Sequence, residues 1–116
     1  MEEKRQGQRL PIGIKLKISN LYKENTNTLM DLDLNVNVID ISSKGIGFTS
    51  DCILPVGYFF IANIELSESL PQIITDVRII RSHAIDKLTF HYGCEFVCIS
   101  PNVGKMLDEY SEKLYS

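Results

Sequence analysis

The chain has 116 residues, of which 44% are hydrophobic and 23% are charged, and its formal net charge is −3. These values are typical of a single globular domain with its own core, and they argue against a disordered chain. A protein that binds DNA or RNA usually carries a basic face, so the negative charge and the dispersed lysines and arginines argue against general nucleic-acid binding.

Residues 11–50 contain three stretches with the pattern of β-strands. In 11–21, isoleucine and leucine alternate with lysine and serine, which predicts a half-buried strand. The polar stretch 23–28 contains two asparagines and predicts a turn. Leucine and valine alternate with aspartate and asparagine over 32–38, which predicts a second strand ending near Asp40. Ile46 and Phe48 predict a short third strand after a glycine.

Residues 58–99 continue the same architecture. The run 58–66 is rich in aromatic and β-branched residues and predicts a fourth strand, and 67–71 predicts a turn. The runs 73–82 and 88–99 predict a fifth and a sixth strand. Strands that recur about every ten to twenty residues, with turn signals between them, are typical of an all-β barrel or sandwich.

The last segment changes its periodicity and predicts an α-helix over about 101–114. Ser100 can cap this helix, and Pro101 suits its first position. Spacing typical of one apolar helical face then connects Val103, Met106, Leu107, Tyr110 and Leu114. We expect the helix to pack on the barrel and close an open end or edge. Its acidic polar face makes contact with an anionic membrane the less favoured alternative.

Two polar segments are candidates for a binding site, and the first lies near the N-terminus. Arg5 and Arg9 stand four residues apart around a glycine. Arginine presents planar donors that match phosphate oxygens, and it stays charged. Such a pair by itself is more often part of a solvated N-terminus.

The second segment, residues 40–45, comes at the end of the second predicted strand. A carboxylate at a strand end, here Asp40, can accept two N–H bonds from a guanine edge, and Ser42 can reach the same side. Gly45 lets the backbone turn or lets a ligand approach closely. Taken alone, these residues equally describe an ordinary hairpin.

Together, the two segments resemble the signatures of PilZ domains. Arg5-x-x-x-Arg9 is followed, after about thirty residues, by Asp40-x-Ser42-x-x-Gly45. The stretch 92–97, Tyr-Gly-Cys-Glu-Phe-Val, is similar to the glycine-x-x-phenylalanine strand near the end of that family. The C-terminal helix also fits, so the resemblance covers nearly the whole chain.

The resemblance implies a six-stranded antiparallel β-barrel that binds the bacterial second messenger cyclic di-GMP. A mobile N-terminal arm, residues 1–10, would grip phosphates and guanine faces, and a barrel domain, residues 11–116, would read a guanine edge. The residues carried over by motif position are Arg5, Arg9, Asp40, Ser42 and Gly45. Lys4 is a further candidate contact, at a position that influences whether one or two ligand molecules bind in the family.

A free-energy argument agrees with an arm that is ordered only by the ligand. Ordering five or six residues costs on the order of 5–10 kcal/mol, whereas two charge-assisted contacts return roughly 1.5–3 kcal/mol each. Stacking of guanidinium groups on the purine rings would have to add the rest. We therefore expect the arm to be mobile without ligand and ordered with it.

The remaining reactive residues do not form a recognisable catalytic or metal site. Cys52, Cys94 and Cys98 cannot all pair, which favours a reducing compartment. The sequence does not open with a signal-peptide pattern, and its longest apolar run is far shorter than a membrane span, so we expect neither. Cys94 and Cys98 are expected to share a strand face, and they and the two histidines do not follow a zinc-site pattern. We expect no metal or cofactor, and no enzyme activity, because no nucleophile elbow frames a serine.

These expectations describe a cytoplasmic, non-enzymatic receptor that signals by conformational change to an unknown partner protein. We expect a monomer or a weak homodimer that binds neither DNA nor RNA and does not insert into a membrane. The alternative is a ligand-independent β-barrel that serves as a protein-interaction module.

Overall fold

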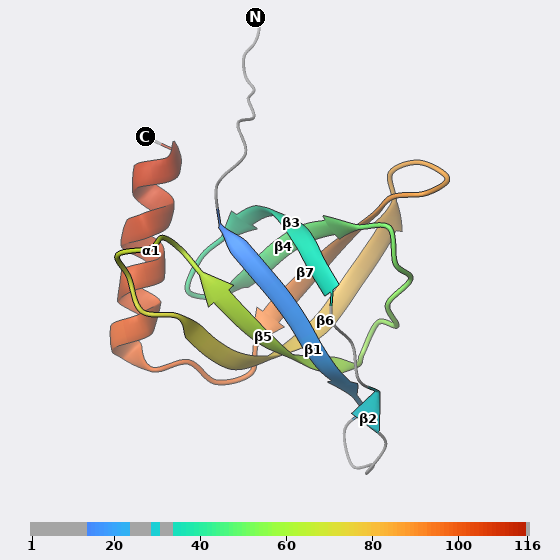
Figure 1. Cartoon of the computed structure of the whole chain (residues 1–116), viewed down its shortest axis with the longest axis horizontal. Helices are drawn as coiled ribbons and strands as arrows, with labels where there is room; N and C mark the ends of the chain where they lie inside the picture. The colour runs from blue at the N-terminus through green and yellow to red at the C-terminus, as the bar shows by residue number, and fades with distance from the viewer. Residues whose placement is uncertain (1–13, 24–28, 31–33, 116) are drawn as a thin grey trace, which may run out of the picture.

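The computed structural model describes residues 14–23, 29–30 and 34–115. Within these ranges the chain forms seven strands and one helix (Figure 1): β1 Lys15–Tyr22, β2 Leu29–Met30, β3 Leu34–Ile41, β4 Gly45–Ser50, β5 Phe59–Glu65, β6 Ile73–Ala84, β7 Phe90–Phe96 and α1 Pro101–Tyr115. Antiparallel pairing follows the order β1-β3-β4-β7-β6-β5, and β5 pairs back with β1. The six strands therefore close into a barrel, which confirms the expected fold. The two-residue strand β2, which extends the pairing of β1, was not predicted.

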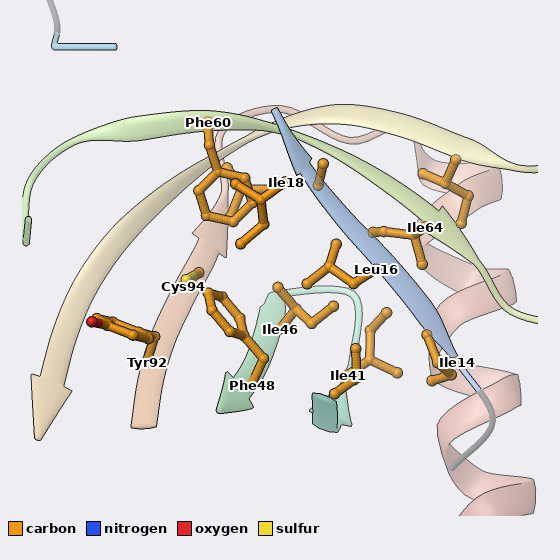
Figure 2. Packing of buried hydrophobic residues seen from close by; sticks show 14 of the residues in the cluster. Ile14, Leu16, Ile18, Ile41, Ile46, Phe48, Phe60, Ile64, Tyr92 and Cys94 are labelled. Carbon is orange, nitrogen blue, oxygen red and sulfur yellow. The ribbon is translucent and has the colours of Figure 1, made fainter. Parts of the chain in front are cut away.

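The core fills the inside of the barrel with apolar side chains that alternate along the strands. In β1 the alternation buries Leu16 and Ile18, which point into the core toward Phe48 of β4, while Phe60 enters beside Ile18 from the neighbouring strand β5 (Figure 2). Phe48 packs edge-on against Phe60, with ring centroids 6.1 Å apart. Among the described residues, none of the buried side chains belongs to a polar or charged residue. The period-two pattern of the sequence is thus explained by burial of one face of each strand.

The helix α1 runs along one side of the barrel (Figure 1) and begins where the sequence predicts. Its start is capped by Ser100, whose Oγ accepts a hydrogen bond from the Val103 N–H at 3.3 Å. Leu107 is fully buried in the barrel core, and Tyr110 donates its hydroxyl to the Leu66 carbonyl at 3.0 Å. The predicted packing of the helix on the barrel is therefore confirmed. No helix of the described chain has the length and apolar character needed to cross a membrane.

The last predicted strand extends too far in the sequence. Residues 88–99 are predicted as one strand, but β7 begins at Phe90 and ends at Phe96. Cys94 is buried inside the barrel, whereas Cys98 lies beyond the strand and is exposed, so the expectation that they share a strand face is wrong. The chain leaves the sheet at this point because it must turn toward the start of α1.

Candidate functional site

Two β-bulges place charged side chains on the outer face of the barrel. In β3 the register against β4 shifts between Val38, which is buried, and Asp40, which is exposed. In β6 the register against β7 shifts in the same way between Ile79 and Arg81. Strict alternation would give both charged residues the inward orientation of Val38 and Ile79. Each bulge inserts one residue and thereby turns the charged side chain outward.

A row of paired residues connects these two charges across four strands. Asp40 pairs with Gly47, Gly47 pairs with Gly93, and Gly93 pairs with Arg81. The two central positions carry no side chain, so the backbone of β4 and β7 forms the floor between the charged ends, and both glycines are buried. A Cβ added to Gly47 would lie 2.5 Å from Asp40 Oδ1, and one added to Gly93 would lie 2.8 Å from Arg81 Nε. The carboxylate and the guanidinium therefore both lie over the glycines.

This floor belongs to a surface hollow of about 550 Å³. Such a volume falls within the range of small-molecule sites. The predicted residues Asp40, Ser42 and Gly45 all line it. Strands β3, β4, β6 and β7, the turn between β3 and β4, and the helix α1 supply the other lining residues, which are Ile41, Lys44, Ile46, Gly47, Ile80, Arg81, His91, Gly93, Cys94, Glu95 and Ser111.

The turn between β3 and β4 is held by hydrogen bonds from two directions. Ser42 Oγ accepts a bond from the Lys44 N–H at 3.1 Å, and the Ser42 N–H donates to the Gly45 carbonyl at 3.0 Å. From outside the turn, Asp108 Oδ1 of α1 accepts the Ser43 N–H at 2.8 Å. The Ser42 hydroxyl thus organises the turn, which is the role expected of it in an ordinary hairpin.

Gly45 is required for a reason that differs from the sequence expectation. The expectation was a backbone turn or a close approach by a ligand, but Gly45 is the first residue of β4 and has no positive φ. A Cβ at Gly45 would lie 2.0 Å from the carbonyl oxygen of Cys94 on the neighbouring strand. The glycine therefore allows β4 and β7 to approach each other closely, and this contact fixes the end of the turn.

The electrostatics of the hollow are balanced. Among its described lining residues, Lys44 and Arg81 contribute two positive charges, and Asp40 and Glu95 contribute two negative charges. Burial lowers the pKa of His91, the neighbouring His83 and Arg81 lower it further, and Asp40 opposes the shift. His91 is therefore neutral near pH 7. An anion that binds here needs additional positive charge from outside the described lining.

The hollow contains no described group with an obvious role in catalysis. Burial raises the pKa of the Cys94 thiol to about 12, so this cysteine is not a thiolate at neutral pH. Within residues 14–23, 29–30 and 34–115, no three metal-ligating side chains come together. The arrangement is suited to holding a ligand between a carboxylate, a guanidinium and a flat backbone floor.

Sequence reasoning missed the half of this site that comes from β6, β7 and α1. Arg81, His91 and Ser111 line the hollow, but they lie about forty to seventy residues from Asp40 in the sequence. The sequence signal that was available is Gly93, which belongs to the recognised stretch 92–97 and supplies part of the floor. The predicted contacts Lys4, Arg5 and Arg9, and with them the predicted arm, lie outside the described residues.

A comparison with known protein families agrees with the fold. The family model described as "PilZ domain" matches residues 3–113, which is nearly the whole chain. The match includes the barrel, most of α1 and every residue named above as a candidate ligand contact. No curated protein matches the chain.

Proposed function

The chain belongs to the PilZ domain family, whose members are cyclic di-GMP-binding adaptors rather than enzymes, and we propose that its outer hollow is the binding site for this dinucleotide. The observation that carries the proposal is the convergence of Asp40, Ser42 and Gly45 on one hollow with a glycine floor. Asp40 would accept N–H bonds from a guanine edge, and the floor would let a flat purine ring approach the backbone.

The charge of the hollow supports a contribution from the N-terminal segment. Its described lining residues balance two positive and two negative charges, whereas cyclic di-GMP carries two ionised phosphodiesters. The proposal assigns the missing positive charge to Arg5 and Arg9, with Lys4 as a further contact. Arginine suits this role because its fork matches phosphate oxygens and its plane stacks on purine rings.

Arg81 adds a further cation that the sequence motifs do not contain. Its guanidinium lies over Gly93, and the register row places it opposite Asp40. In the proposed complex Arg81 would contact the phosphate or stack on the base, while Asp40 would read the base edge from the other side.

Another hollow of similar size, about 550 Å³, is a poor alternative site for this ligand. It lies between the β3–β4 turn and α1, and its lining includes Asp108, Glu109 and Glu112 but only one lysine, Lys105. A dianionic ligand would meet a surplus of negative charge there. The volume of the two hollows does not separate them, but their charge does.

Calorimetric titration with cyclic di-GMP tests the proposal directly. The wild type should bind, and Arg9→Ala and Asp40→Ala should each lower the affinity more than tenfold, because each removes a charge-assisted contact worth roughly 1.5–3 kcal/mol. Asp51→Ala is the matched control, since Asp51 is an exposed aspartate in the loop after β4 and does not line the hollow. It should leave the affinity unchanged.

A folded wild type that fails to bind by calorimetry and by equilibrium dialysis would contradict the proposal. That result would favour the alternative function, a barrel that contacts partner proteins without a ligand. If binding is observed, the proposal extends to a cytoplasmic adaptor in which the occupied hollow changes the surface shown to a partner protein.

A further inference from the structure

A histidine in the hollow has a buried nitrogen without a hydrogen-bond partner. His91 Nε2 is shielded from solvent, and no described residue donates to it or accepts from it. It is the one such side-chain atom found within the described ranges. Leaving a buried polar atom unpaired is unfavourable, so an unpaired atom in a surface hollow is a candidate contact for a ligand.

The position of His91 connects it with the residues of the proposed site. His91 lies in β7 two residues before Gly93, pairs with Thr49 of β4, and faces outward on the same side of the sheet as the glycine floor. It lines the same hollow as Asp40 and Arg81. The site described from the family motifs does not use this side chain.

We propose that His91 is a ligand-contacting residue of the hollow, and that its Nε2 forms a hydrogen bond with the bound dinucleotide. The inference rests on the proposed function and adds to it a polar contact on β7, beside the phosphate-binding and base-reading groups. Among the described residues of the free protein this nitrogen has no partner, and in the complex it gains one.

A metal site formed by the two histidines is not supported. The rings of His83 and His91 lie with their centroids 4.9 Å apart in an edge-to-face arrangement, and their backbones are paired across β6 and β7. A protein metal site usually needs at least three ligands. No third ligand joins the two histidines within the described chain.

The contact has a consequence for the pH dependence of binding. In the free protein, burial and the neighbouring His83 and Arg81 of β6 keep the pKa of His91 below its usual value, against the attraction of Asp40 of β3. Lys44 and Glu95 are the other charged residues of the lining, and β4 contributes none. Two phosphodiesters would favour the imidazolium and raise this pKa in the complex.

The sign of the pH dependence follows from this difference. Because the protonated form binds the anion better, affinity rises as the pH falls through the pKa of the complex and levels off below the pKa of the free protein. At about pH 6 the wild type should take up a fraction of a proton on binding. Calorimetry in two buffers with different heats of ionisation measures this uptake.

Two substitutions of His91 test the contact in the full chain. At about pH 8, where the imidazole is neutral, His91→Leu should lower the affinity for cyclic di-GMP about three- to tenfold, and His91→Gln should retain most of it, because the amide can replace Nε2. Asp51→Ala again serves as the control, since Asp51 is exposed and does not line the hollow. It should change the affinity less than about twofold.

The outcomes separate this inference from the proposed function. Binding by the wild type with an unchanged affinity of His91→Leu would overturn the inference and leave the receptor function standing. Undiminished proton uptake by His91→Gln would also overturn it. No binding by the wild type would remove both, whereas the expected losses, with the control unaffected, would support the contact.

Discussion

Two outer faces of this barrel use the same antiparallel pairing but carry opposite kinds of surface. Over β1 and β5, cross-strand side chains cover the backbone. Tyr22 stacks on Phe59 with ring centroids 5.4 Å apart, and Lys15 approaches Glu65 at 3.7 Å. Over β4 and β7, Gly47 pairs with Gly93 and neither contributes a side chain, so the Asp40 and Arg81 side chains reach over the backbone from the neighbouring strands.

The difference shows how a small closed barrel obtains a concave site. Its interior is filled by apolar side chains and has no room for a dinucleotide (Figure 2). The hollow is produced on the outside, by omitting side chains from two strands and by turning charged residues outward with bulges on the two strands beside them. The face over β1 and β5 has the opposite design, because its side chains stabilise each other across the strands.

Among substitutions that test this difference between the two faces, the largest loss of stability should come from adding one methyl group to the face that carries the hollow. Gly45→Ala would place a Cβ against the Cys94 carbonyl, where only a backbone shift can relieve the overlap. We expect the free energy of unfolding to fall by about 1–3 kcal/mol. Chemical denaturation measures this change.

Gly104→Ala provides the matched control for that substitution. Gly104 is also buried, but it lies in α1, and an added Cβ would be 3.4 Å from the Ser43 side chain. Stability should stay unchanged or rise by up to about 1 kcal/mol, because alanine favours the helix. Equal losses for the two variants would mean that the close approach of β4 and β7 has no special role.

A smaller effect is expected on the opposite face. Phe59→Leu keeps an apolar side chain but removes the stacked pair with Tyr22, and it should lower the free energy of unfolding by about 0.5–1.5 kcal/mol. The affinity for cyclic di-GMP should not change, because Phe59 does not line the hollow. Denaturation and calorimetry on the same preparation test both statements. A loss of affinity without a loss of stability would contradict the expectation that the face over β1 and β5 takes no part in ligand binding.

The barrel could be predicted from the sequence because each strand buries one face, so apolar and polar residues alternate along it. This alternation gives the wrong orientation for Asp40, which follows Val38 at a spacing of two and would therefore point inward in a regular strand. The outward position depends on the bulge between them. Nothing in the local alternation indicates this bulge, and the residue was singled out by its place at the strand end and by the family motif.

The residues that the sequence did not reveal are those placed by long-range register. Arg81 reaches the hollow because β6 has its own bulge, and His91 reaches it because β7 is paired between β4 and β6. Their sequence neighbours look like those of any exposed strand. A pattern within one segment cannot indicate which other strand lies next to it, so these contacts required the folded structure.

The smallest expected effect concerns the support of the β3–β4 turn by the helix. In Figure 1 this turn lies beside α1, and Asp108 Oδ1 accepts the Ser43 N–H at 2.8 Å. Asp108→Ala should therefore speed hydrogen exchange of the Ser43 amide while leaving global stability nearly unchanged. Asp108→Asn keeps an acceptor oxygen and should largely preserve the protection. Glu109→Ala is the control for loss of an acidic side chain on the same exposed turn of α1.

The pH dependence of that protection distinguishes the carboxylate from mere proximity of the helix. The hydrogen bond from Ser43 lowers the pKa of Asp108, and the nearby Lys44 lowers it as well. A depressed carboxyl pKa means that the stabilisation is present above the unfolded value of about 3.9 and is lost as the pH falls through the folded value. After correction for intrinsic exchange rates, the wild-type protection of Ser43 should weaken in this acidic range. In Asp108→Asn the protection should stay constant there, and a parallel loss in both proteins would show that another group holds the turn.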